Sequence, residues 1–303
     1  MSARIVTVAA TQMSASRDTP ANTDRAERLV RQAAAAGARV ILLQELFETP
    51  YFCIEHEPEF LALATPLAGN ALIARFAALA RELGVVLPIS WYERAGNTQF
   101  NSVAMIDADG EVLGTYRKTH IPEAIGYHEK FYFSPGDTGF RVWDTAHARV
   151  GVGICWDQWF PEAARCLALL GAEVILYPTA IGSEPSDDGF DSMPHWRNTM
   201  QGHAAANIVP VVASNRIGRE QARSVVRHID FYGSSFIADH RGELCAQADR
   251  GTESVLVHAF DLDAIAEYRR GWGVYRDRRP GCYAMIDSTF GVEPAQDPRR
   301  APR

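Results

Sequence analysis

Residues 150–162 read V-G-V-G-I-C-W-D-Q-W-F-P-E, and this stretch predicts the class of fold. It opens with valine, glycine and isoleucine, which are typical of a short buried strand. It closes on Pro161, after which apolar residues recur at helical spacing, so a helix is expected to begin there. Cys155 therefore falls where a buried strand turns toward a helix. In open α/β sheets, ligands bind at this end of the strands.

The position of Cys155 permits two interpretations. The N-terminus of a helix carries a partial positive charge, which favours the thiolate form of a nearby cysteine. A buried cysteine is, however, more often an inert packing residue. The rest of the sequence is needed to choose between a reactive and an inert thiol.

The composition argues against several classes of protein. The chain has 303 residues, of which 47% are hydrophobic and 22% are charged, as expected for a globular protein with a sizeable core. Its net charge of −7 argues against nucleic acid or an anionic membrane as a partner. No apolar run approaches the roughly 18 residues that a transmembrane helix needs.

The cysteines and histidines suggest neither disulfides nor a metal. The five cysteines are odd in number and irregular in spacing, and no C-x-x-C pair occurs. This pattern is neither a disulfide framework nor a zinc motif, and H-E-x-x-H is absent, so no metal site is predicted. The apolar run at the N-terminus is too short for a signal peptide and predicts a first strand. Together these features predict a cytoplasmic protein.

Helical and extended patterns alternate along the chain. Their order is β-α-β-α-β-β-β and then β-α-β-α-β-β-β-α, two similar halves of one domain, which implies helices that cover the faces of sheets. We expect a single domain over residues 1–290 and a polar tail over residues 291–303 that is disordered or bound to a partner. Besides the helix after Pro161, helices are predicted over residues 19–36, 70–83, 195–206 and 264–270. Besides the strand before Cys155, strands are predicted over residues 4–10, 40–43, 85–92, 99–106, 111–117, 173–177, 209–213, 231–238 and 255–261.

Three charged or reactive residues lie where predicted strands end: Glu45, Lys118 and Cys155. A cysteine hydrolase needs a thiolate, a base that takes its proton and a donor for the developing oxyanion. Histidine is the usual base, but only His120 lies near a strand end. A buried glutamate can serve instead, with lysine as the oxyanion donor. From spacing alone, Glu45 could also be a capping or salt-bridged carboxylate, and Lys118 an exposed lysine in a turn.

The segments around these residues resemble a known family. L-L-Q-E-L-F-E-T-P-Y-F contains Glu45, Y-R-K-T-H-I-P contains Lys118, and G-I-C-W-D-Q-W-F-P-E contains Cys155. In this order they resemble the three signature blocks of the nitrilase superfamily of carbon–nitrogen hydrolases, and the similarity extends over nearly the whole chain. The resemblance implies an α/β fold, a four-layer α-β-β-α sandwich, with a Glu-Lys-Cys triad and no cofactor. It also implies a homo-oligomer, a dimer or larger.

The resemblance implies a role for each residue of the site. Cys155 would be the nucleophile, Glu45 the general base, and Lys118 the group that stabilises the tetrahedral intermediate. Glu129, in E-K-F-Y-F-S-P-G-D, matches a second glutamate of many members and would position Lys118 or the substrate. The backbone N–H of Trp156 is expected to be the second oxyanion donor. The alternative from another class, a non-catalytic interaction module, would lack a residue of the triad.

The substrate follows from the same resemblance. Within the superfamily, the sequence is similar to enzymes that hydrolyse the ureido group of N-carbamoylputrescine to putrescine, carbon dioxide and ammonia in polyamine synthesis. N-carbamoyl-D-amino acid hydrolases carry two arginines after the nucleophile, where this chain has Gln158 and Trp159. Without these guanidinium groups a substrate carboxylate would lose its best partner. We therefore expect a small cationic N-carbamoyl amine as substrate, with another aliphatic amidase or a ureidopropionase-like enzyme as the alternative.

Two groups of residues could bind the tail of such a substrate. The acidic loop at residues 183–188 contains Glu184 and Asp187, which could bind the distal ammonium; a solvated acidic loop is an equally good interpretation. Aromatic residues could line the four-carbon chain, although core packing would explain each of them as well: Tyr51, Phe52, Tyr132 and Trp156.

Overall fold

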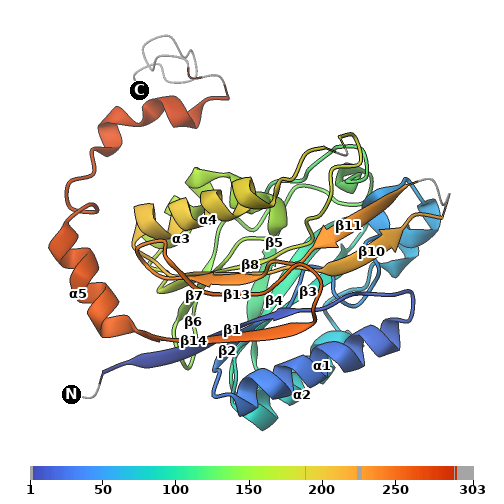
Figure 1. The fold of residues 1–303 in the computed structure, drawn as a ribbon, viewed down its shortest axis with the longest axis horizontal. Coiled ribbons are helices and arrows are strands. Elements are labelled where there is room, and N and C mark those ends of the chain that lie inside the picture. Colours follow the sequence, from blue (N-terminus) through green and yellow to red (C-terminus); the bar gives the residue numbers. More distant parts are fainter. Residues whose placement is uncertain (1–2, 188, 224–226, 290, 292–303) are drawn as a thin grey trace. The chain divides into compact units, whose positions relative to one another are not determined.

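Two sheets lie face to face between two pairs of helices in the computed structural model (Figure 1). Helices α1 (Thr19–Ala35) and α2 (Ala71–Leu83) cover one sheet, and helices α3 (Pro161–Leu169) and α4 (Met193–Asn207) cover the other. This is the four-layer α-β-β-α sandwich that the family resemblance implies. The structure describes residues 3–187, 189–223, 227–289 and 291.

The two sheets have matching strand orders. One runs β14-β1-β2 and continues into β3-β4-β5 through hydrogen bonds from Ile41 N–H to the Val86 carbonyl (3.1 Å) and from Val86 N–H to the Arg39 carbonyl (2.8 Å). In the other sheet, the strands in the same positions are β6-β7-β8-β9-β12-β13. The strands are β1 (Ile5–Gln12), β2 (Val40–Leu42), β3 (Leu87–Ala95), β4 (Thr98–Ile106), β5 (Val112–Arg117), β6 (Val142–Asp144), β7 (Arg149–Val152), β8 (Val174–Pro178), β9 (Val211–Ser214), β12 (Phe236–Ala238), β13 (Leu244–Gln247) and β14 (Ser254–Asp261).

Parallel pairing brings the ends of strands from both sheets together. β1 and β2 are parallel, and so are β7, β8 and β9. Just beyond β2, the Glu45 N–H donates across the sandwich to the carbonyl of Thr179, which follows β8, at 3.4 Å. Cys155 lies just beyond β7. Its thiol is 3.8 Å from the carbonyl of Ala180, the residue after Thr179. Glu45 and Cys155 therefore border the same segment of chain.

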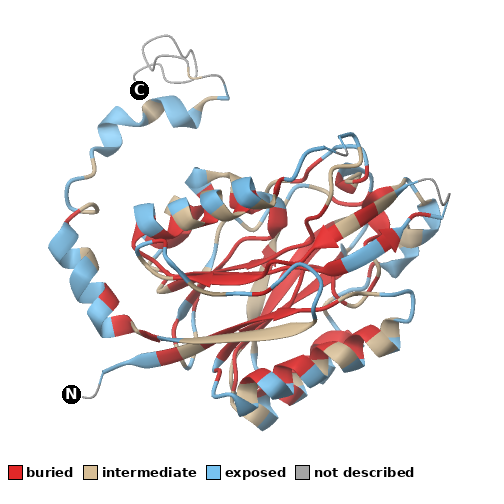
Figure 2. Cartoon of the chain, viewed as in Figure 1, coloured by how far each residue is buried: buried red, intermediate tan, exposed pale blue. Residues whose placement is uncertain are grey.

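The helices begin and end where their sequences predict. Asp18 caps α1 by accepting from Ala21 N–H at 3.1 Å, and Asn70 caps α2 by accepting from Ile73 N–H at 3.1 Å. Gly84 ends α2 with a left-handed φ of 63°, a conformation that glycine adopts without a Cβ clash. Buried apolar residues recur at helical spacing on the inner faces, where Figure 2 shows burial concentrated on the helices and strands.

The first part of the aromatic loop between β2 and α2 is packed rather than solvent-exposed. A 3-10 helix, η1 (Phe52–Ile54), is fully buried there, and a second, η2 (Pro58–Leu63), follows it. Phe52 stacks on Tyr92 with ring centroids 5.2 Å apart and meets the edge of Tyr132 at 5.0 Å. These rings belong to a core cluster beside the site, so the loop is held in one conformation.

The second half of the chain differs from its prediction. The single strand predicted over residues 231–238 is wrong: β11 (His228–Tyr232) ends, and β12 begins only at Phe236. Gly233 and Ser234 have φ of 53° and 57°, which interrupts an extended strand. Three further features were not predicted: the hairpin of β10 (Ile217–Gln221) with β11, strand β6 and strand β13. These strands are too short to show a clear alternation of apolar and polar residues.

The contacts divide the chain into two units, residues 1–262 and residues 263–303. Helix α5 (Leu262–Trp272) begins at this boundary, and the second unit also contains the 3-10 helices η5 (Pro280–Cys282) and η6 (Ala284–Asp287). The predicted single domain over residues 1–290 stays a prediction. The predicted tail over residues 291–303 lies outside the described residues except for Gly291. Among the described residues, the helices are too short or too polar to span a membrane.

Candidate active site

Lys118 joins two buried carboxylates, Glu45 just beyond β2 and Glu129 in the 3-10 helix η3 (Glu129–Phe131). It follows β5, and its Nζ donates to Oε1 of Glu45 at 2.8 Å and to Oε2 of Glu129 at 2.6 Å. Lys118 and Glu45 are both fully buried. The interpretation of Lys118 as an exposed turn lysine is therefore wrong. Burying an ammonium group is costly unless carboxylates pair with it, which is what Glu45 and Glu129 do.

One oxygen of Glu45 is held in place while the other is free to accept. Oε1 accepts from Lys118 and from the side-chain amide of Asn101, which lies 2.7 Å away. Oε2 is buried and has no hydrogen-bond partner among the described residues. A carboxylate fixed through one oxygen with an unpaired second oxygen is suited to accept a proton from a neighbouring group. Asn101 was not predicted, because its role depends on a partner that lies far away in the chain.

Burial and charge set the ionisation of the lysine and its partner. Burial alone would lower the pKa of Lys118, but Glu129 and Glu45 raise it well above its ordinary value, so the ammonium stays charged. Burial raises the pKa of Glu129 to about 7, against the opposing effect of Lys118. The hydroxyl of Tyr51 donates to the other oxygen of Glu129 at 2.8 Å. Glu129 is thus held between Lys118 and Tyr51.

Cys155 sits at the start of a tight turn that is unusual for a residue with a side chain. It opens the 3-10 helix η4 (Cys155–Trp159) and has a left-handed φ of 39°. Such conformations cluster at functional sites because the surrounding structure must enforce them. Burial, together with the nearby Glu45 carboxylate, raises the pKa of the Cys155 thiol well above its ordinary value. Burial and the Glu45 carboxylate thus oppose the effect expected of a helix N-terminus, and they favour a thiol that needs a base.

Asp157 holds the turn that carries Cys155. Its buried carboxylate accepts from Ile154 N–H at 2.9 Å and from the Tyr116 hydroxyl at 2.7 Å. The backbone N–H and the ring Nδ1 of His120 lie 3.0 and 2.7 Å from its other oxygen. Because His120 lies two residues after Lys118, Asp157 ties the cysteine turn to the lysine segment. The sequence analysis did not single out Asp157, whose role depends on partners distant in the chain.

Arg216 holds the backbone segment that carries Glu45, as Asp157 holds the turn that carries Cys155. It is almost completely buried, and its guanidinium donates to the carbonyls of Glu45, Leu46 and Thr49. Its Nη1 also pairs with Glu220 at 2.8 Å. These carbonyls follow β2 and have left the sheet, so the guanidinium satisfies groups that would otherwise be buried without donors. Arg216 was also missed, since an arginine after a strand gives no local sign of its partners.

A cavity of about 450 Å³ opens onto Cys155. Trp156, Trp159 and Glu129 form part of its wall. Two of the predicted substrate-binding residues, Glu184 and Asp187, also line it. The described residues of the wall include no lysine or arginine. Burial raises the pKa of Glu184, as expected for a carboxylate that faces a half-enclosed cavity.

The structure does not bring three predicted aromatic residues to this wall. Phe52 packs in the core cluster instead. Tyr51 is buried behind Glu129, and Tyr132 is buried with its hydroxyl donating to the carbonyl of Glu55 at 2.6 Å. For both residues, packing and a fixed hydroxyl partner explain the burial. Of the pair that replaces the two arginines, Trp159 lines the cavity, whereas Gln158 is buried with its side-chain oxygen accepting from Trp196 at 2.7 Å.

A fold of this kind, with a buried glutamate, lysine and cysteine at the ends of its strands, defines a class of hydrolase. Residues 7–270 match the carbon-nitrogen hydrolase family, and the chain belongs to this family, within the nitrilase superfamily. It is an enzyme that hydrolyses carbon–nitrogen bonds other than peptide bonds. The family and fold that the sequence predicted are confirmed.

Individual relatives are similar over nearly their whole length. The chain is 58% identical to the N-carbamoylputrescine amidase of Solanum tuberosum, covering 97% of this chain and 98% of that protein. It is 50% identical to the citrullinase of Francisella tularensis, covering 93% of this chain and 98% of that protein. Among solved structures, a carbon-nitrogen hydrolase from Helicobacter pylori G27 is 36% identical with a TM-score of 0.89, covering 94% and 99% of the two chains.

Proposed function

We propose that the protein hydrolyses the ureido carbon–nitrogen bond of N-carbamoylputrescine to putrescine, carbon dioxide and ammonia, as a step of polyamine synthesis. The observation that carries this proposal is the 58% identity, over nearly the full length of both chains, to a protein named for that reaction. The chemistry of the cavity agrees with it. A small cationic N-carbamoyl amine needs a reactive centre at one end of its site and negative charge at the other.

The cavity offers both kinds of group. Cys155 and Glu129 line it, and so do Glu184 and Asp187. A distal ammonium would be stabilised by these carboxylates, and the faces of Trp156 and Trp159 suit the alkyl chain between the two ends. In this proposal Glu184 and Asp187 bind the amine, and no cofactor or metal takes part in the reaction.

The mechanism we propose is acyl transfer through a cysteine. Cys155 attacks the ureido carbonyl, and the unpaired Oε2 of Glu45 takes the thiol proton and passes it to the leaving nitrogen. Lys118 and the backbone N–H of Trp156 stabilise the oxyanion. A water molecule activated by Glu45 then attacks the acyl-enzyme, which frees the Cys155 thiol and releases a carbamic acid. The carbamic acid breaks down to carbon dioxide and the second amine product. Glu129 keeps Lys118 charged and in position.

A second candidate substrate is citrulline, because the chain is 50% identical to a citrullinase. Citrulline carries the same ureido group, but its far end bears a carboxylate as well as an ammonium. The described wall of the cavity has no arginine or lysine to pair with that carboxylate, and it has acidic groups that would repel it. We therefore propose the cationic N-carbamoyl amine, and not citrulline, as the preferred substrate.

Ammonia release across a panel of ureido compounds tests this order. The panel consists of N-carbamoylputrescine, citrulline, N-carbamoyl-β-alanine and the neutral N-butylurea. We expect the highest kcat/KM for N-carbamoylputrescine, and a higher value for citrulline or N-carbamoyl-β-alanine would overturn the proposal. In Glu184→Gln and Asp187→Asn, KM should rise more for the cationic substrate than for N-butylurea. Equal rises would remove these carboxylates from the amine site.

We further propose that the protein forms a homo-oligomer in the cytoplasm and that residues 1–290 form a single domain. Exposed apolar side chains in the second unit support an assembled state, since Trp272 and Ile286 are each 65% exposed. Light scattering coupled to size-exclusion chromatography of the full chain measures the assembly. A mass equal to one chain at micromolar concentration would contradict it.

A further inference from the structure

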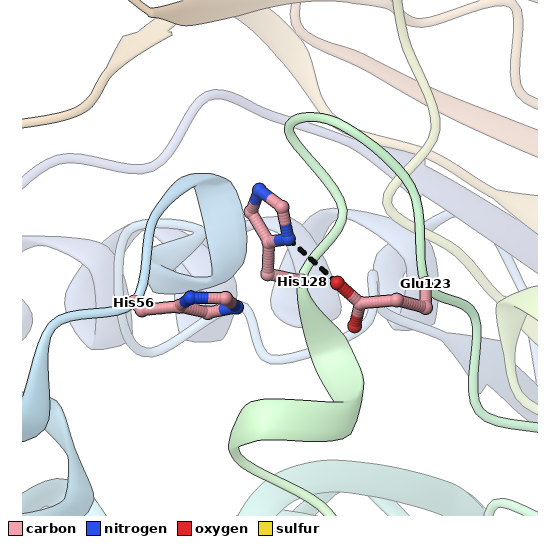
Figure 3. Close-up of side chains that lie close together, drawn as sticks. All are labelled: His56, Glu123 and His128. Atoms are coloured by element: carbon pink, nitrogen blue, oxygen red, sulfur yellow. Dashed lines mark hydrogen bonds and ion pairs between the residues drawn. The ribbon is translucent and has the colours of Figure 1, made fainter.

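Three side chains with metal-binding atoms converge near the catalytic residues, and one of them, Glu123, also lines the cavity. His56, Glu123 and His128 each offer one such atom, and these atoms all lie within 4.8 Å of one another. Figure 3 shows the three side chains pointing toward a common space. Nδ1 of His128 lies 2.7 Å from Oε1 of Glu123, and the two imidazole rings have centroids 4.4 Å apart.

We propose that His56, Glu123 and His128 form a binding site for a divalent transition-metal ion of the zinc class. Two imidazole nitrogens and one carboxylate oxygen form a ligand set that zinc uses, with water in the remaining position. Calcium and magnesium prefer all-oxygen surroundings, so two imidazoles select against them.

The spacing suits an ion after small side-chain rotations. Bonds of about 2.0–2.2 Å in a tetrahedral site separate neighbouring ligand atoms by roughly 3.3–3.6 Å. The 2.7 Å contact between His128 and Glu123 would lengthen, and the longest separation, up to 4.8 Å, would shorten. His56 and Glu123 are exposed, so these rotations do not disturb the core.

The backbone that carries the ligands is already fixed. The N–H of His128 donates to the carbonyl of Cys53 at 2.8 Å, which joins it to the buried segment just before His56. Ala124 and Tyr127 exchange two backbone hydrogen bonds, of 3.2 and 2.9 Å, which close the loop between Glu123 and His128. The site therefore needs adjustment of side chains only, which limits the entropy lost on binding.

The positive charge of Arg227 disfavours the binding of a metal ion at this site. A guanidinium nitrogen of Arg227 lies 3.5 Å from Nε2 of His128. If His128 binds metal through Nδ1, its Nε2 carries the proton, and Arg227 must turn away. Arg227 is exposed and can do so. Its positive charge nevertheless weakens binding, so its removal should strengthen it.

The site is distinct from the catalytic residues, but one of its three side chains belongs to the wall of the same cavity. Glu123 lines the same cavity as Cys155, and His128 directly precedes Glu129. An ion here would hold the loop at residues 123–128 against the His56 segment. The inference concerns metal binding alone and does not depend on which ureido compound is the substrate.

Isothermal titration of the untagged, full-length chain with zinc chloride tests the site. The titration uses the Cys155→Ala protein, because a thiol also binds zinc. We expect about one zinc ion per chain. His56→Ala, His128→Ala and Glu123→Gln should each weaken binding at least about tenfold, because even indirect partners of a ligand contribute that much.

Two further variants make the test specific. His258→Ala removes a partly exposed histidine of β14 that lies outside the cluster, so its affinity should match that of the parent. Arg227→Ala should bind zinc more tightly. Melting curves measured without zinc establish that each variant is folded. A parent that binds no zinc, or losses in the three ligand variants no larger than in His258→Ala, would overturn the proposal.

Discussion

The guanidinium of Arg216 donates to the main-chain carbonyl of Glu45, with Nη2 3.0 Å from the oxygen. Arg216 comes directly after β9, and Glu45 follows β2, in the other sheet. The contact therefore fixes the segment that carries the proposed general base to the opposite layer of the sandwich. A residue of this kind acts on the reaction only through the residue that it positions.

Arg216→Met should destabilise the protein by about 3–5 kcal/mol, because it leaves Glu220 as a buried carboxylate without its partner. Chemical denaturation measures the change. The matched control is Arg219→Met, which removes a solvent-exposed ion pair with Asp230 and should hardly change the midpoint. Equal losses in the two variants would show that the buried network is not what stabilises this segment.

Cys155→Ala should lower kcat by at least about 10³-fold while the protein stays folded, because the proposed nucleophile is gone. Ammonia release and circular dichroism measure the two effects. Cys245→Ala is the control, since this partly exposed thiol lies outside the wall of the cavity and its loss should leave turnover unchanged. Appreciable activity in Cys155→Ala would exclude Cys155 as the nucleophile.

Asp157→Asn should lower kcat by about 10–100-fold with little change in KM. The amide cannot accept from all the groups that now meet the carboxylate, so the Cys155 turn shifts, and small misplacements of reacting groups are costly. Tyr116→Phe removes one donor to the same carboxylate and should cause a smaller fall. Normal turnover per folded molecule in Asp157→Asn would restrict Asp157 to a role in stability.

Glu129→Gln should lower kcat more than it raises KM, because Lys118 then retains only one carboxylate partner, Glu45. Tyr51→Phe removes only the hydroxyl that meets Glu129 and should cost less. Steady-state kinetics of both variants provides the comparison. A rise in KM alone would assign Glu129 to substrate binding instead.

The proposed amine site should depend on pH through Glu184. Its raised pKa means that Glu184 takes up a proton at a higher pH than an exposed glutamate does. As the pH falls, the cavity loses negative charge, so KM for a cationic ureido compound should rise. KM for N-butylurea should stay level, and Glu184→Gln should abolish the difference. If KM for the cationic compound depends on pH in Glu184→Gln as it does in the original protein, the pH dependence does not come from Glu184.

The placement of Glu45, Lys118 and Cys155 could be predicted from the sequence, because it depends on local features. Each residue follows an apolar or β-rich run, and the surrounding letters match a family pattern in order. The capped ends of α1 and α2 were likewise readable from Asp18 and Gly84. The break at residues 233–235 was not, since a positive φ in a non-glycine residue leaves no clear mark in the sequence.

By itself, then, the sequence determined the family and the layered fold, and it predicted the three residues on which the proposed site depends. Only the tertiary structure decided which partners surround them: Asn101 and Arg216 on Glu45, Asp157 on the Cys155 turn, and Tyr51 behind Glu129 rather than along the cavity. It also supplies the burial and the Glu45 carboxylate that raise the pKa of the Cys155 thiol. The physical reason is that burial and the field of neighbouring charges come from segments far apart in the chain, which only folding brings together.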